Sequence, residues 1–62
     1  MIIGQQVRLI EYGDRIIDRV LVAVENQYIY VCKREEFEAA IQQNRQPICI
    51  GFRPEDLVEA LN

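Results

Sequence analysis

The stretch that decides the fold is VLVAVENQYIYVC, residues 20–32. An apolar run from Val20 to Val24 leads through Glu25, Asn26 and Gln27 into a second run, Tyr28–Cys32. Runs of β-branched and aromatic residues separated by a short polar turn predict two antiparallel strands joined by a tight hairpin. Gly is the preferred second residue of such a turn, and Gln27 stands in its place.

On the N-terminal side, two strands are predicted, separated by the turn residues of segment 12–14. Residues 6–11 alternate partially between apolar and polar, which predicts a first strand. A long second strand is predicted from Arg15 to Glu25, and its mixed pattern favours a strand that bends at a bulge and changes its buried side. We place that bend at Asp18-Arg19.

On the C-terminal side, helical periodicity replaces the strand pattern. Phe37, Ala40 and Ile41 follow the i, i+3, i+4 spacing of an apolar helix stripe, which predicts a helix from Arg34 to Asn44. Lys33 is a poor N-cap, whereas Asn44 is able to take the left-handed conformation that ends helices. A short fourth strand is predicted within residues 47–52.

The last segment allows two interpretations. Pro54 with Glu55 and Asp56 is typical of a helix start, which would give a second helix with Leu57, Val58 and Leu61 on its apolar stripe. Alternatively, residues 54–56 form one 3-10 turn before a fifth strand, 57–61. The first interpretation gives an antiparallel sheet with two packed helices; the second gives a small α+β barrel.

The second interpretation resembles the SH3-like barrel: four to five antiparallel strands, a long bending second strand, and a 3-10 turn before the last strand. The helix is then inserted between strands 3 and 4. Peptide-binding SH3 domains have a long loop after the first strand and a groove containing Trp, whereas here that loop is residues 12–14 and there is no Trp. Residues 31–40 and 47–52 also resemble small uncharacterised bacterial proteins, which implies no activity.

Length and charge restrict the class of protein. At 62 residues the chain is predicted to form a single domain, residues 1–62, with so small a core that a homodimer or a docked partner would add stability. No apolar run is long enough for a membrane helix and no secretory signal is present, so we expect no membrane insertion and a cytoplasmic location. The net charge is −3 and the basic residues are scattered, so nucleic acid is not the expected partner.

The residue inventory argues against catalysis. His, Ser and Thr are all absent, which removes the usual hydroxyl nucleophiles and the most versatile acid–base group. Two Cys residues without His do not complete a four-ligand zinc site within one chain. Gly4, Gly13 and Gly51 are too far apart for a phosphate-binding loop. We therefore expect no enzyme activity, no catalytic residue, no metal site and no cofactor.

Cys32 and Cys49 have two main interpretations. Both would commonly be small buried apolar residues on adjacent strands, which is the favoured interpretation. Alternatively, neighbouring strands bring them within bridging range as a redox-sensitive pair. Zinc held by four thiolates across a dimer is a third hypothesis, and it ranks below the other two.

The aromatic residues give the functional hypothesis. Tyr28 and Tyr30 are predicted to share one face of the sheet, with Tyr12 joining from the neighbouring hairpin and Arg8 or Arg19 beside them. Tyrosine and arginine are enriched in interaction hot spots, although the rings alternatively only cover the sheet. The favoured function is a small non-catalytic interaction module, a docking subunit or adaptor of a larger bacterial assembly with a protein partner. The alternative is a nucleic-acid-associated small barrel or a small regulatory protein.

Overall fold

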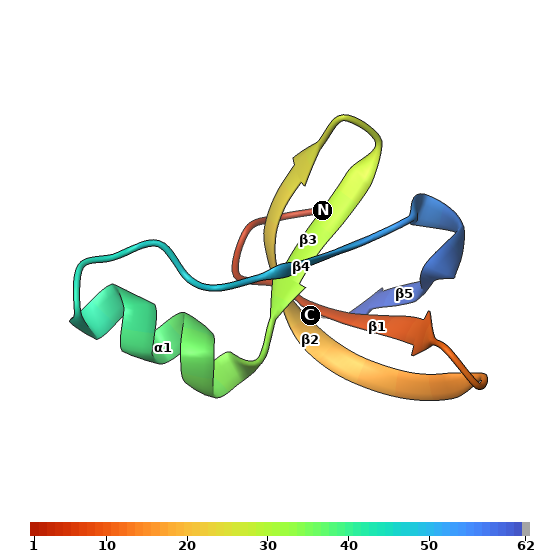
Figure 1. The fold of residues 1–62 in the computed structure, drawn as a ribbon, viewed down its shortest axis with the longest axis horizontal. Coiled ribbons are helices and arrows are strands. Elements are labelled where there is room, and N and C mark those ends of the chain that lie inside the picture. The colour runs from red at the N-terminus through yellow and green to blue at the C-terminus, as the bar shows by residue number, and fades with distance from the viewer. Residues whose placement is uncertain (62) are drawn as a thin grey trace.

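The computed structural model describes residues 1–61 and contains one antiparallel sheet of five strands with one α-helix beside it (Figure 1). The elements in chain order are β1 (Gln6–Glu11), β2 (Arg15–Glu25), β3 (Tyr28–Cys32), α1 (Arg34–Gln42), β4 (Ile50–Phe52), the 3-10 turn η1 (Pro54–Asp56) and β5 (Leu57–Leu61). The strand order across the sheet is β4-β3-β2-β1-β5. The predicted first three strands are confirmed with their bounds.

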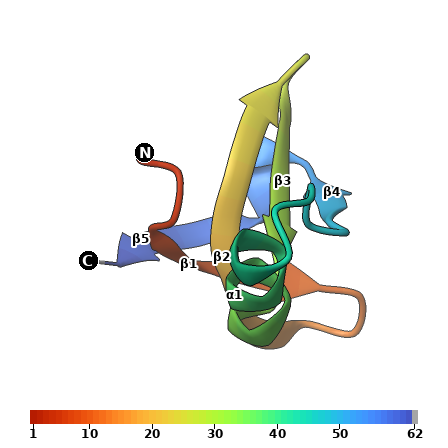
Figure 2. The ribbon, with the colours of Figure 1, turned by 90° about the vertical axis from the view of Figure 1, so that its left-hand side faces the viewer.

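The long strand β2 pairs with β1 along its first half and with β3 along its second half. It curves strongly, so that the β2–β3 hairpin stands apart from the layer of β1 and β5 (Figures 1 and 2). The register irregularity lies between Leu21 and Ala23, so the prediction of a bulge at Asp18-Arg19 is wrong. The reason lies in the pairing: Asp18 and Arg19 pair regularly with β1, whereas the N–H and C=O of Leu21 bond to the segment before β1.

The turns and helix ends follow their residue chemistry. Asn26 and Gln27 both have positive φ, 50° and 68°, which is the turn that matches the twist of a two-residue hairpin. Lys33 precedes α1 without a side-chain capping bond, as predicted. The helix ends at Gln42, two residues earlier than predicted, and Asn44 takes the expected left-handed conformation with φ 55°.

The core lies on the inner side of the curved sheet. Its fully buried members come from the three central strands: Val7, Leu9, Leu21, Ile29 and Val31. Ile17, Phe52 and Leu57 pack against this cluster and are only partly buried. Apolar burial is the main favourable term for a domain of this size, so strands β1 to β3 carry most of the stability.

Within residues 1–61, three buried apolar residues lie outside the core cluster. Val20 and Cys32 are cross-strand partners in β2 and β3; both are buried, and neither belongs to the core cluster. Ala40 is the buried residue of α1, which contacts the sheet through β2. Ile41, predicted on the same stripe, is 66% exposed, so that part of the prediction is wrong.

The α+β class is confirmed, and the alternative with a second helix is wrong because residues 57–61 form β5. The sheet is not closed into a barrel. Within residues 1–61, the two edge strands β4 and β5 do not pair with each other. β4 has only three residues, so the sheet ends on this side in a very short edge strand.

Candidate functional site

Two of the predicted interaction residues are neighbours on the outer face of β3. The ring centroids of Tyr28 and Tyr30 lie 6.4 Å apart, with ring planes tilted by 46°. A Cβ at Gly51, the β4 partner of Tyr30, would lie only 3.1 Å from Cε1 of that ring. Tyr30 therefore covers a glycine of the edge strand, while Tyr28 remains 46% exposed at the hairpin.

The structure does not bring Tyr12 to this pair. Tyr12 is fully exposed in the β1–β2 turn, and that turn points away from the β2–β3 hairpin in both views (Figures 1 and 2). The predicted face is therefore at most a pair of tyrosines on β3, and whether this pair binds a partner stays a prediction.

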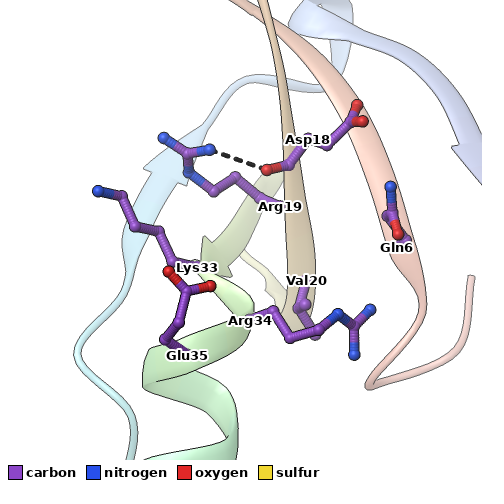
Figure 3. A pocket seen from close by; sticks show the side chains of 7 residues that line it. All are labelled: Gln6, Asp18, Arg19, Val20, Lys33, Arg34 and Glu35. Atoms are coloured by element: carbon purple, nitrogen blue, oxygen red, sulfur yellow. Dashed lines mark hydrogen bonds between the residues drawn. The ribbon is translucent and has the colours of Figure 1, made fainter.

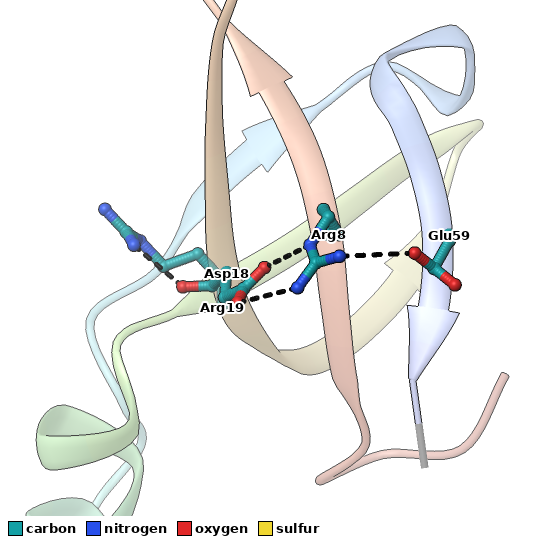
Figure 4. A network of polar contacts seen from close by, with 4 residues as sticks. All are labelled: Arg8, Asp18, Arg19 and Glu59. Atoms are coloured by element: carbon teal, nitrogen blue, oxygen red, sulfur yellow. Dashed lines mark hydrogen bonds and ion pairs between the residues drawn. The ribbon is translucent and has the colours of Figure 1, made fainter.

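The predicted arginines lie at a second place, on either side of Asp18 (Figure 4). Arg8 donates from Nε to Asp18 at 2.8 Å and from Nη1 to Glu59 at 3.4 Å, which links β2, β1 and β5. The hydrogen bond from Arg8 is the main cause that lowers the pKa of Asp18. Arg19 donates to the backbone oxygen of Asp18 at 2.8 Å and points away from Arg8. Arg8 is thus engaged in a cross-strand network, which leaves Arg19 as the more available cation.

One feature of the site was not predicted from the sequence: an apolar groove beside β4. We call it the β4 groove, with a volume of about 330 Å³. Its apolar wall is formed by Ile17, Val31, Ile48, Ile50 and Phe52. Ile48, just before β4, and Ile50, its first residue, are 79% and 68% exposed, although large aliphatic residues are normally buried. The alternation of Ile48, Ile50 and Phe52 with Cys49 and Gly51 predicted a strand, but it gave no sign that the apolar side of this segment is exposed.

The segment before β4 is fastened to α1 by one carboxylate. Glu36 accepts hydrogen bonds from Arg45 at 2.6 and 3.2 Å and from the backbone N–H of Ile48 at 2.8 Å. These bonds, that of Arg45 first, lower the pKa of Glu36 from 4.5 to about 2. Arg45 also donates to Gln43 and to the backbone oxygen of Gln46. The groove wall is thus held in position by a charged side chain of α1.

The rim of the β4 groove carries charges of both signs. Four charged residues line it: Glu11, Arg19, Lys33 and Glu36. Glu11 is paired with Arg15 at 3.2 Å, and Glu36 is paired with Arg45. Within residues 1–61, Arg19 and Lys33 form no ion pair, and Asp18 is bonded mainly by Arg8. A ligand in the groove therefore meets apolar walls, two carboxylates that already have partners, and the cations of Arg19 and Lys33. Arg19 also donates to the backbone oxygen of Asp18.

A second hollow lies at the start of α1, with a volume of about 390 Å³ (Figure 3). Arg19, Lys33 and Arg34 line it together with the carboxylates of Asp18 and Glu35. Figure 3 shows that these groups approach from β2, from Lys33 just before α1 and from the first turn of the helix. The mixture of charges gives this hollow no clear preference for one sign of ligand.

The two cysteines differ in their surroundings. Cys32 is buried, as predicted, whereas Cys49 is exposed, so the interpretation of both as buried apolar residues is wrong for Cys49. In the part of the chain that the structure describes, no group of three or more metal-ligating side chains comes together. None of the helices described in residues 1–61 has the length and apolar character needed to cross a membrane.

Comparison with known proteins identifies no family: no protein-family model, no curated protein and no solved structure matches the chain. The geometry of the site is therefore the basis for the functional proposal.

Proposed function

We propose that this protein is a small non-catalytic docking module whose β4 groove binds an apolar, acidic segment of a partner protein. The observation that carries the proposal is the exposure of Ile48 and Ile50, 79% and 68%, side by side on one wall of a groove. Contiguous exposed apolar residues next to a hollow mark interaction sites more often than isolated ones do. Fully burying one such side chain contributes about 1.5–3 kcal/mol.

The edge position of β4 supports an extended segment as the ligand. β4 ends the sheet, and within residues 1–61 it pairs with β3 alone. An exposed edge offers unpaired N–H and C=O groups, and an extended peptide adds to it as a further strand. Alternate side chains of such a peptide would point into the groove, because side chains of a strand alternate between its two faces.

Charge supports an acidic segment. The unpaired Arg19 and Lys33 at the rim would meet Asp or Glu residues of the ligand, which improves specificity and association rate. This preference holds although the whole chain has a net charge of −3, because the local cations lie at the groove.

The exposed surface is large enough for docking. A folded monomer of this mass exposes about 4,200 Å², whereas this chain exposes 4609 Å². A specific interface takes about 800 Å² from each partner, a share that so small a domain is able to supply on one side.

We include in this proposal the resemblance of the fold to an SH3-like barrel. The long second strand shared between two halves of the sheet and the 3-10 turn before β5 support it. We propose an opened relative of that plan in which the uncovered end of the sheet serves as the docking site.

The test is a selection of random peptides displayed on phage against the purified protein, followed by binding measurements with the enriched peptides. We expect enriched peptides to combine large apolar residues with Asp or Glu. Ile50→Glu should weaken their binding at least about tenfold, equivalent to 1.4 kcal/mol. Ile41→Glu is the matched control, because Ile41 is 66% exposed and lies on α1 outside the groove.

Three outcomes would overturn the proposal. Peptides that bind wild type and Ile50→Glu equally would remove the β4 groove as the site. Sedimentation of the wild type as a dimer, and of Ile50→Glu as a monomer, would make a second copy the ligand. Binding of a labelled single-stranded RNA that falls steeply with salt would favour the nucleic-acid alternative.

A further inference from the structure

The register of β3 and β4 leads directly to the two cysteines. Ile29 pairs with Phe52, Tyr30 with Gly51 and Val31 with Ile50, after which the ladder ends. The next pair in this register is Cys32 with Cys49. Residues directly opposite each other on antiparallel strands have Cα atoms about 4.5–5.5 Å apart, which falls inside the range of about 4.4–6.8 Å that disulfides require.

The two thiols have unequal access to solvent. Cys49 is exposed, so it is the thiol that meets a dissolved oxidant first. Cys32 is 5% exposed. Burial is the main cause that raises the pKa of Cys32, and Glu36 and the nearby Cys49 raise it further. Cys32 is therefore inert toward solvent and reacts only with a neighbour that reaches it.

We propose that Cys32 and Cys49 form a cross-strand disulfide when the protein meets a small-molecule disulfide such as oxidised glutathione. The Cys49 thiolate attacks one sulfur of the oxidant, forming a mixed disulfide and releasing one glutathione thiolate. The Cys32 thiolate then attacks the Cys49 sulfur and displaces the second glutathione. Two protein thiols are oxidised and one glutathione disulfide is reduced to two thiols, so that atoms and electrons balance.

The bond would extend the β3–β4 ladder by one pair and fasten the groove wall. Cys49 lies between Ile48 and Ile50, and the backbone N–H of Ile48 donates to Glu36. The effect on ligand binding rests on the proposed function of the β4 groove. The formation of the bond does not, because it depends on register and access alone.

The first experiment measures bond formation. The reduced protein is incubated with oxidised glutathione and its intact mass and free thiols are determined. We expect loss of two hydrogen atoms, no free thiol and a monomeric mass. Cys49→Ala should stay unmodified, whereas Cys32→Ala should stop at a glutathione adduct or an intermolecular dimer through Cys49. A wild type that stops at the adduct or the dimer would overturn the proposal.

The second experiment separates this inference from the proposed function. Hydrogen exchange of the Ile48, Cys49 and Ile50 amides should slow at least tenfold in the oxidised protein, without any ligand. Binding of a peptide selected against the reduced protein should then change at least threefold on oxidation. Slowed exchange with unchanged peptide binding would keep the disulfide and remove its link to docking. Unchanged exchange would show that the bond does not fasten this segment.

Discussion

The centre of the sheet and its β4 edge differ in how well they are covered. Around β1, β2 and β3, Leu9 and Val7 are completely buried, and hairpins and ion pairs join neighbouring strands. At β4, Ile48 and Ile50 face a groove with most of their surface in water. β3 and the segment around β4 both alternate between the two faces of the sheet, so this pattern alone does not decide burial. What decides it is whether a second layer covers the strand.

The difference indicates how stability and the proposed docking function divide between two regions of a very small domain. Strands β1, β2 and β3, which we call the covered half, supply the apolar burial that a chain of 62 residues needs to fold. The uncovered half, β4 with the segment before it, contributes less to stability, and our proposal places the ligand there. A substitution in each half should test this division directly.

The largest effect is expected in the covered half. Leu9→Ala removes a side chain with 0% exposure and should cost about 3 kcal/mol or more, which is close to the whole stability of so small a domain. Ile50→Ala, at 68% exposure, should cost less than about 1 kcal/mol. Urea unfolding followed by circular dichroism measures both. Equal losses of unfolding free energy in the two variants would contradict the difference between the two regions. They would mean that Ile50 is buried in the protein in solution.

Acid should loosen the uncovered half before the core. The folded-state pKa of Glu36, about 2, lies below its ordinary value of 4.5, so its ionised form stabilises the fold fully above pH 4.5. That contribution is lost as the pH falls from 4.5 through about 2. Between those values, the Ile48 amide should exchange faster while the β1–β2 amides stay protected.

Glu36→Gln is the matching variant. It should be less stable than wild type at neutral pH, and the gap should shrink toward acid as wild-type Glu36 becomes protonated. The unfolding midpoint in urea, measured across the acid range, tests this. Asp18→Asn is the control, because Asp18 is also held in its ionised form, but by Arg8 in the covered half. If Asp18→Asn exposes the Ile48 amide as much as Glu36→Gln does, the two halves are not independent.

A smaller effect is expected at the tyrosines, which lie at the border of the two halves. Tyr30→Ala uncovers Gly51 of the edge strand and should cost about 1 kcal/mol, the size of a strong cross-strand aromatic contact. Tyr28→Ala, at an exposed position, should stay within about 0.5 kcal/mol. Thermal unfolding of both variants measures the difference. A double variant that keeps peptide binding but melts earlier would assign both rings a structural role.

The strand and helix positions could be predicted because local chemistry agreed with the tertiary structure. The alternating run at Tyr28–Cys32, the turn residues 12–14 and the helix spacing of Phe37 and Ala40 each had one consistent interpretation. The bend in β2 was misplaced because it depends on which segment pairs with Leu21, and that partner, residues 4–5, is distant in sequence.

The candidate site was harder to predict because it consists of apolar side chains that no second layer of the protein covers. A run such as Ile48, Ile50 and Phe52 predicts a strand, and a strand pattern carries no information about whether a second layer lies over it. The charge network had the same limit: the distance between Glu36 and Arg45 depends on how the chain returns after Asn44. The sequence therefore predicted the elements and missed the groove between them.

The smallest expected effect on the free energy of unfolding is in the β2–β3 turn, which belongs to the covered half. Gln27 has φ 68° in the β2–β3 turn, a conformation that costs a residue with a side chain about 1 kcal/mol. Gln27→Gly removes this cost but increases the freedom of the unfolded chain, so the net gain should be about 0.5 kcal/mol. Asn26→Gly is the control, since asparagine already tolerates positive φ. Urea unfolding should rank Gln27→Gly above wild type and Asn26→Gly at or below it. Because the turn joins only β2 and β3, the gain should leave the exchange of the Ile48 amide unchanged, and a parallel slowing there would show that the two halves fold as one unit.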